Sequence, residues 1–329
     1  MTCMFQKGNA LLYRLASVLF ATSILLSGCA TVPTATLRNA ASLAKAGEAA
    51  SLQMETSLTI SQKSLDLYRK AVAFNDGFNS APASAQLEMN MAGIEQRLAQ
   101  YRSLVQSLFV AYSAMDSLAE YGGASGFDSA ITGLSASVSR FGDAVGKPVH
   151  LSAGLQKGIQ EGGNLLVGSI QVKKLVTASR AIDGSLKQVI AILSDPTVRA
   201  AIVPIKGEMQ GVVGQAAEIL YSKGVYSYGP ILNQFGAPFG LHATAKADQA
   251  VRANKRLQAG LFAVVNETVN SQVARSKQTY DLELGALRAL VAQHTKFEKG
   301  EPISLQNLAG IVSNLQALTR VQQSAGAEK

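Results

Sequence analysis

The chain has 329 residues and carries 30 Lys and Arg against 22 Asp and Glu, which gives a net charge of +8. Its length allows one large domain or two small ones. It has no Trp and only eight Pro, and Ala, Ser, Leu, Val and Gln dominate, a composition that favours an all-α fold. The basic residues are scattered along the chain, so the charge does not indicate nucleic acid as a partner.

The first segment has the pattern of an export signal. Lys7 and Arg14 precede an apolar stretch, 15–26, of about 12 residues, which suits a signal-peptide core and is too short to cross a bilayer. The stretch ends in Leu26-Ser27-Gly28-Cys29, which resembles the lipobox of bacterial lipoproteins. The resemblance implies cleavage between Gly28 and Cys29, removal of residues 1–28, and acylation of Cys29, for example with palmitate. The alternatives are an ordinary secretory signal with a chance Cys, or an uncleaved anchor.

Acylation of Cys29 would fix the mature chain to a lipid bilayer. Cys3 leaves with the signal, so the mature chain has no cysteine pair for a disulfide. Ala30, not Asp, follows Cys29; by the sorting rule of enteric bacteria this implies the outer membrane, facing the periplasm, if the organism is Gram-negative. Loss of Lys7 and Arg14 lowers the charge to +6, which suits anionic lipid or cell-wall polymer.

The mature chain is predicted to begin with a lipidated N-terminus and short tether, 29–36, followed by one helical domain, 37–329. A first helix is expected over about Leu37–Phe74, before turn residues at Asn75–Ser80. A second helix begins near Ser84 and carries a heptad seam: Leu87, Met91, Ile94, Leu98, Tyr101, Val105, Leu108, Tyr112 and Met115. Such a seam predicts an antiparallel hairpin with the first helix, or else self-association of the chain.

Glycine is frequent in the middle of the chain, over 121–168. We expect two short helices there, near Asp128–Val145 and Leu151–Gln160. A third long helix is predicted over about Ser169–Leu193, and Asp195-Pro196 caps the next.

Three further helices are expected to complete the domain. The helix after Pro196 should be kinked by Pro204. The longest one is predicted as a single element over about Thr244–Phe297, and Ser304 starts a last one. Taken together, the pattern predicts an elongated bundle of long, antiparallel, coiled-coil-like helices with a Gly-rich middle segment.

The segment 224–245 contains no Lys, Arg, Asp or Glu. Its Pro and Gly residues argue against a helix, so we expect an apolar loop. Four aromatic residues make it a candidate binding loop: Tyr226, Tyr228, Phe235 and Phe239. They either tuck onto the helices and close the core, or form an exposed patch for a partner or a membrane.

No motif for catalysis or for a cofactor was found. His150, His242 and His294 have no second His at ligand spacing, so no metal site is indicated. His294 lies on an apolar seam and is expected to be a hydrogen-bonded core histidine. These patterns favour a non-enzymatic envelope lipoprotein, which would be either a structural protein or an accessory subunit bound to an envelope protein. The alternative is a membrane-active protein, similar in architecture to helical pore-forming proteins; an enzyme is the third interpretation.

Overall fold

A computed structural model describes residues 32–79, 85–121, 126–149, 167–202, 205–244 and 246–324. Every regular element within these ranges is a helix, which confirms the all-α prediction. Gly28 and Cys29 lie outside the described residues, as do the rest of 1–31 and the helix predicted over Leu151–Gln160. None of the described helices is both long and apolar enough to cross a membrane.

The first helix, α2 (Val32–Asn79), is longer at both ends than its pattern predicted. Pro33 is compatible with a first helical turn, because that turn needs no donor from it. At the other end the expected break at Asn75–Ser80 is wrong for residues 75–79. The Asn75 side chain donates to the backbone oxygen of Val212, 3.3 Å away, so a tertiary contact holds the helix past its turn-forming residues.

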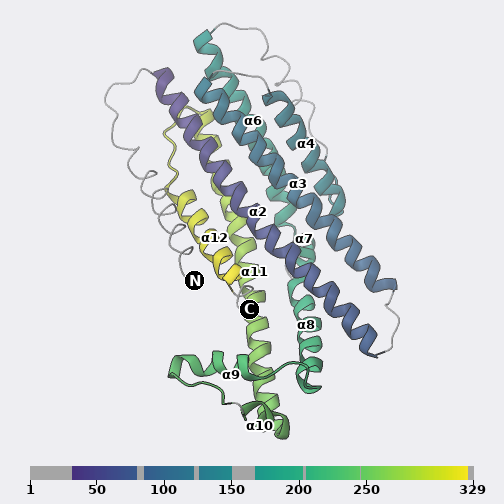
Figure 1. The fold of residues 1–329 in the computed structure, drawn as a ribbon. Coiled ribbons are helices and arrows are strands. Elements are labelled where there is room, and N and C mark those ends of the chain that lie inside the picture. The colour runs from purple at the N-terminus through teal and green to yellow at the C-terminus, as the bar shows by residue number, and fades with distance from the viewer. Residues whose placement is uncertain are drawn as a thin grey trace, which may run out of the picture.

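α2 packs against α3 (Ala85–Tyr121). Ion pairs join Lys45 to Glu120 at 2.7 Å and Arg69 to Glu95. Because the partner's number falls as the α2 number rises, these two helices run in opposite directions (Figure 1). The predicted seam of α3 is buried at Met91 and from Leu98 onward, at Leu98, Tyr101, Val105, Leu108, Tyr112 and Met115.

Gly47 allows α2 and α3 to approach closely. It is buried within α2, directly against the ring of Tyr112. A Cβ atom at this position would lie inside the van der Waals radii of three carbons of that ring. The absence of a side chain at Gly47 is therefore what leaves room for Tyr112.

The middle of the chain adds two helices to this pair. α4 (Phe127–Ala144) and α6 (Val167–Ser194) have nearly the predicted bounds and pack against each other and against α3. The next helix begins where Asp195-Pro196 predicted it. Asp195 caps it, because its side chain accepts from the backbone nitrogens of Thr197 and Val198, at 2.8 and 3.4 Å. The helix predicted to kink at Pro204 is two elements, α7 (Pro196–Ile202) and α8 (Ile205–Ser222).

The expected single helix over Thr244–Phe297 is also divided. α10 (Ala247–Ala253) ends at Asn254, and α11 (Lys255–Glu298) begins after it. The Asn254 backbone is extended and its side chain accepts from the nitrogens of Arg256 and Leu257, at 3.0 and 3.2 Å. Asn254 thus acts as an N-cap, a role for which Asn is well suited. α12 (Gln306–Ser324) follows and packs on α11 and α2.

The predicted loop 224–245 contains two short helices, which corrects the expectation that Pro and Gly exclude them. α9 (Gly229–Gly236) carries Pro230 in its first turn, where the missing donor costs little. The 3-10 helix η2 (Ala237–Phe239) follows directly.

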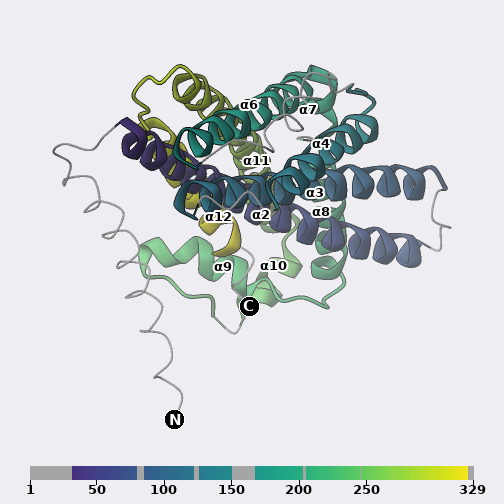
Figure 2. The ribbon, with the colours of Figure 1, turned by 90° about the horizontal axis from the view of Figure 1, so that it is seen from above.

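α9 and α10 lie outside the main group of helices, at the end opposite to the start of α2 (Figures 1 and 2). Tyr228, Val251 and the α11 residue Leu261 form a small core here, which is separate from the large core of the long helices. We call the part from Lys223 to Arg256 the tip.

Candidate binding surface

The four aromatic residues of the candidate binding loop differ in their exposure to solvent. Tyr228 is fully buried, whereas Tyr226, Phe235 and Phe239 are 50, 61 and 72% exposed. Neither interpretation of the sequence therefore applies to all four. One ring closes a core, and three face solvent.

Tyr228 anchors the tip to the end of α8. Its ring stacks on Tyr221, with 5.0 Å between the ring centroids. Its backbone nitrogen donates to Asp248 at 2.6 Å, and the guanidinium of Arg252 lies over the ring, 5.3 Å from its centroid. The tip is thus joined to the bundle through the aromatic stack of Tyr228 on Tyr221.

Arg252 fixes the shape of the tip by using its donors in three directions. Its Nε donates to Asp248 at 2.6 Å. Its two terminal nitrogens donate to the backbone oxygens of Tyr221 and Tyr226, at 2.5 and 2.6 Å. The planar guanidinium holds several acceptors at once in a fixed geometry. The hydrogen bond from the Tyr228 nitrogen, together with that from the Arg252 Nε, holds the pKa of Asp248 below its usual range.

A tight turn presents three large apolar side chains to solvent. Phe235, Phe239 and Leu241 are 61, 72 and 63% exposed; we call residues 235–241 the apolar knob. Gly240 has a φ of 68°, and the Leu241 nitrogen donates to the Gly236 oxygen at 3.0 Å. A Cβ at Gly236 would lie 2.6 Å from the Leu241 oxygen. The two glycines therefore allow the chain to fold back and keep these side chains outward.

The surroundings of the apolar knob are uncharged or basic. Between Glu218 and Glu267 the only acidic residue is Asp248, which Arg252 and the Tyr228 nitrogen engage. The same interval contains exposed basic residues: Lys223, Lys246, Lys255 and Arg256. His242 directly follows the knob and is exposed.

A buried polar chain crosses the main bundle. His294 is fully buried, with its Nε2 hydrogen-bonded to the Tyr112 hydroxyl at 2.9 Å and its Nδ1 to the Ser179 hydroxyl at 2.8 Å. Ser179 also donates to Glu298 at 3.3 Å. Burial lowers the pKa of His294 to about 3, so the ring is neutral at pH 7. The prediction of a hydrogen-bonded core histidine is confirmed.

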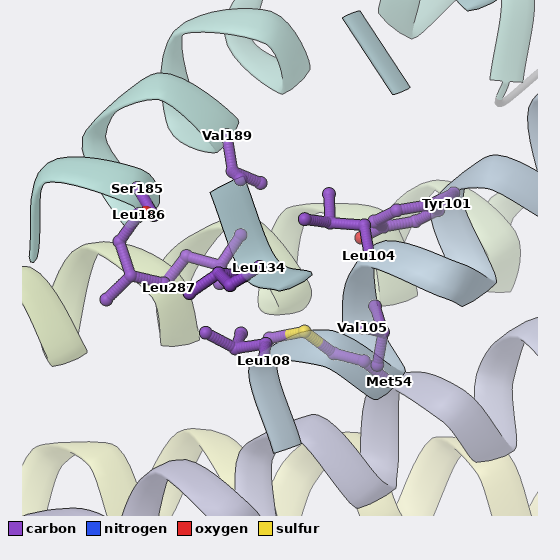
Figure 3. Close-up of a pocket in the computed structure, with 10 residues that line it drawn as sticks. All are labelled: Met54, Tyr101, Leu104, Val105, Leu108, Leu134, Ser185, Leu186, Val189 and Leu287. Carbon is purple, nitrogen blue, oxygen red and sulfur yellow. The ribbon is translucent and has the colours of Figure 1, made fainter. Parts of the chain in front are cut away.

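Ser179 and His294 have the chemistry of a nucleophile and a base, but neither is exposed to solvent. The cavity shown in Figure 3 does not reach them. Its volume is about 10 Å³ and its lining is apolar apart from Ser185 and Tyr101. Such a space holds at most about one water. Within the described ranges no three His, Cys, Asp or Glu side chains converge to hold a metal; His150 lies outside them.

Comparison with known proteins found no matching protein family, no similar curated protein and no similar solved structure.

The sequence interpretation missed Leu241, Asp248 and Arg252. Asp248 and Arg252 carry a signal that could have been used, since acidic and basic residues four apart pair on a helix. Leu241 has no such signal, because its exposure depends on the turn at Gly236 and Gly240.

Proposed function

We propose that the protein is an envelope lipoprotein with a structural or binding role, anchored through acylated Cys29. The single observation behind this is the sequence Leu26-Ser27-Gly28-Cys29, placed directly after an apolar stretch. Helix α2 begins at Val32, three residues later. A domain attached so closely would stay next to the membrane that holds its lipid.

We further propose that the long helices act as an elongated, coiled-coil-like antiparallel bundle that works as a spacer. α2 has 48 residues, which at 1.5 Å per residue corresponds to about 70 Å. The tip lies at the end opposite to the start of α2 (Figure 1). In this arrangement the lipid holds one end of the protein and the tip is free to bind at the other, as an accessory subunit of an envelope assembly.

The anchor is tested with two cysteine variants of the full chain in cells fed an alkyne analogue of palmitate. The wild type should be labelled and should sediment with membranes. Cys29→Ser should lose the label, whereas Cys3→Ser is the matched control and should keep it. Labelling that survives Cys29→Ser, or is lost in Cys3→Ser, would refute the lipid anchor.

The accessory role is tested on the lipidated wild-type protein, extracted in mild detergent and separated by native electrophoresis. The proposal expects a defined band above the mass of the 34.5 kDa chain that contains other envelope proteins. A band containing this chain alone, at a multiple of its mass, would indicate self-association instead.

A further inference from the structure

We propose that the apolar knob is a membrane-docking element that enters the interface of an anionic phospholipid bilayer. This inference deepens the proposed function by naming the partner of the tip, and it assumes that the tip is free to bind. It does not require that Cys29 be acylated.

The first support is the kind of side chains exposed. Phe235, Phe239 and Leu241 are each more than 60% exposed within seven residues. A soluble domain rarely leaves large apolar side chains clustered on its surface without a use. Leu and Phe are also the residues that interfacial segments place among the acyl chains.

The second support is the absence of charge around these side chains. No Lys, Arg, Asp or Glu occurs over 224–245, so insertion of the knob would not bury an ionised group. The side-chain oxygen of the exposed Asn233, just before the knob, accepts from the Ala243 nitrogen at 2.6 Å. The knob can thus leave water with its turn hydrogen bonds intact.

The third support is charge complementarity, and it selects the partner. Four exposed basic residues accompany the knob in the tip, at Lys223, Lys246, Lys255 and Arg256. The single acidic residue there, Asp248, is paired with Arg252. Apolar residues combined with Lys and Arg are typical of segments that bind anionic lipid surfaces, where each basic residue adds to the attraction.

The fourth support is mechanical. The tip packs on the bundle through a small core that includes Leu261 of α11, and it is braced by Arg252, so the knob is held on a folded support. Docking then loses little conformational entropy. This differs from an unstructured apolar loop, which would have to become ordered on the membrane.

The test uses residues 29–329 with Cys29→Ser, from which nothing that the structure describes has been removed. Phe239→Cys then provides the only thiol, for labelling with an environment-sensitive fluorophore. Leu67→Cys on α2, where Leu67 is 53% exposed, gives the control label. Both are titrated with vesicles of phosphatidylglycerol and phosphatidylethanolamine, and with neutral phosphatidylcholine vesicles.

We expect the label at position 239 to shift to the blue and brighten at least twofold with the anionic vesicles. The label at position 67 should not respond, and 0.5 M NaCl should weaken the response, since salt screens the basic residues. No response at position 239, or an equal response at both positions, would overturn the proposal.

Two double variants measure the contribution of the knob to binding in a vesicle sedimentation assay. Phe235→Ser with Phe239→Ser should weaken partitioning at least tenfold. Leu67→Ser with Val110→Ser removes two residues that are also about half-exposed and should change it less than twofold. Equal losses in the two would indicate non-specific adhesion and overturn the proposal. All four positions are on the surface, and circular dichroism checks that both variants fold.

A photo-crosslinker at Phe239 in cells distinguishes a lipid from a protein. Phospholipid adducts as the main product support the proposal, whereas one defined protein adduct would overturn it in favour of a protein pocket. Failure here leaves the palmitate labelling of Cys29 unaffected. Conversely, failed labelling of Cys29 leaves the vesicle response intact, so the two hypotheses fail separately.

Discussion

Replacing Gly47 by Ala should destabilise the protein, although Ala is the better helix former. In an unhindered helix this change stabilises by about 1 kcal/mol. At Gly47, however, the added methyl group would overlap the ring of Tyr112. Tyr112 is fully buried and its hydroxyl is bonded to His294, so the ring has no free direction in which to move.

The size of the effect follows from these opposing contributions. Overpacking a core by one methyl group costs about 1–3 kcal/mol. Displacement of the ring would also strain the bond to His294, and an unsatisfied buried polar group costs about 1–3 kcal/mol. Once the gain in helix propensity is subtracted from these costs, we expect the free energy of unfolding to fall by about 2 kcal/mol.

The assay is urea unfolding followed by circular dichroism, with Gly133→Ala as the matched control. Gly133 lies inside α4, and a Cβ there would meet nothing within 4 Å. This control should be as stable as the wild type or more stable, by up to about 1 kcal/mol. In a Tyr112→Ala background the ring is gone, and Gly47→Ala should then stabilise as well.

The reasoning would be refuted if Gly47→Ala matched Gly133→Ala in the wild-type background. It would also be refuted if the cost of Gly47→Ala were the same with and without the Tyr112 ring. Either result would mean that α2 and α3 do not approach each other as closely as Gly47 and Tyr112 indicate.

Three other predictions concern the polar contacts. The pKa of His294 is about 3 when folded and near 6.5 when unfolded, so unfolding takes up a proton below pH 6.5. Stability should therefore fall as the pH drops from about 6.5 towards 3, less steeply for His294→Gln than for the wild type; parallel pH profiles would contradict this. In Arg252→Lys the lysine cannot bind all three acceptors, so proteolysis at the tip should increase while the thermal midpoint of unfolding of the bundle stays constant. Equal resistance of the variant and the wild type to protease would argue against bracing by Arg252. Asn254→Ala removes an N-cap and should weaken hydrogen-exchange protection in the first turn of α11 by about 1 kcal/mol, whereas unchanged protection would exclude the cap.

The all-α class and the seam of α3 could be predicted because each depends on local periodicity. Tyr101, Val105 and Leu108 recur at spacings of three and four, and burial of one helical face follows from that alone. The cap at Asp195 was predictable for the same reason, since the capping bonds of its side chain go to backbone nitrogens of the next turn. These features need no knowledge of distant residues.

The errors came from contacts between distant or competing residues. Asn75 remains helical because it bonds to Val212, more than a hundred positions away. Tyr228 and Tyr226 have the same chemistry in the same loop, and both rings contact Tyr221. Only Tyr228 donates its backbone nitrogen to Asp248 and is buried, whereas Tyr226 is half-exposed. Nothing in the local pattern separates these two tyrosines. The break at Asn254 is different, since its capping chemistry is local and was outweighed by the long apolar seam on both sides.

The most direct test of the central claim is the mass of the N-terminal peptide of the protein purified from membranes. The lipoprotein account predicts a chain that starts at Cys29, with a mass increase equal to a diacylglyceryl group and an amide-linked acyl chain. A peptide that starts at Met1, or one in which Cys29 carries no lipid, would contradict it.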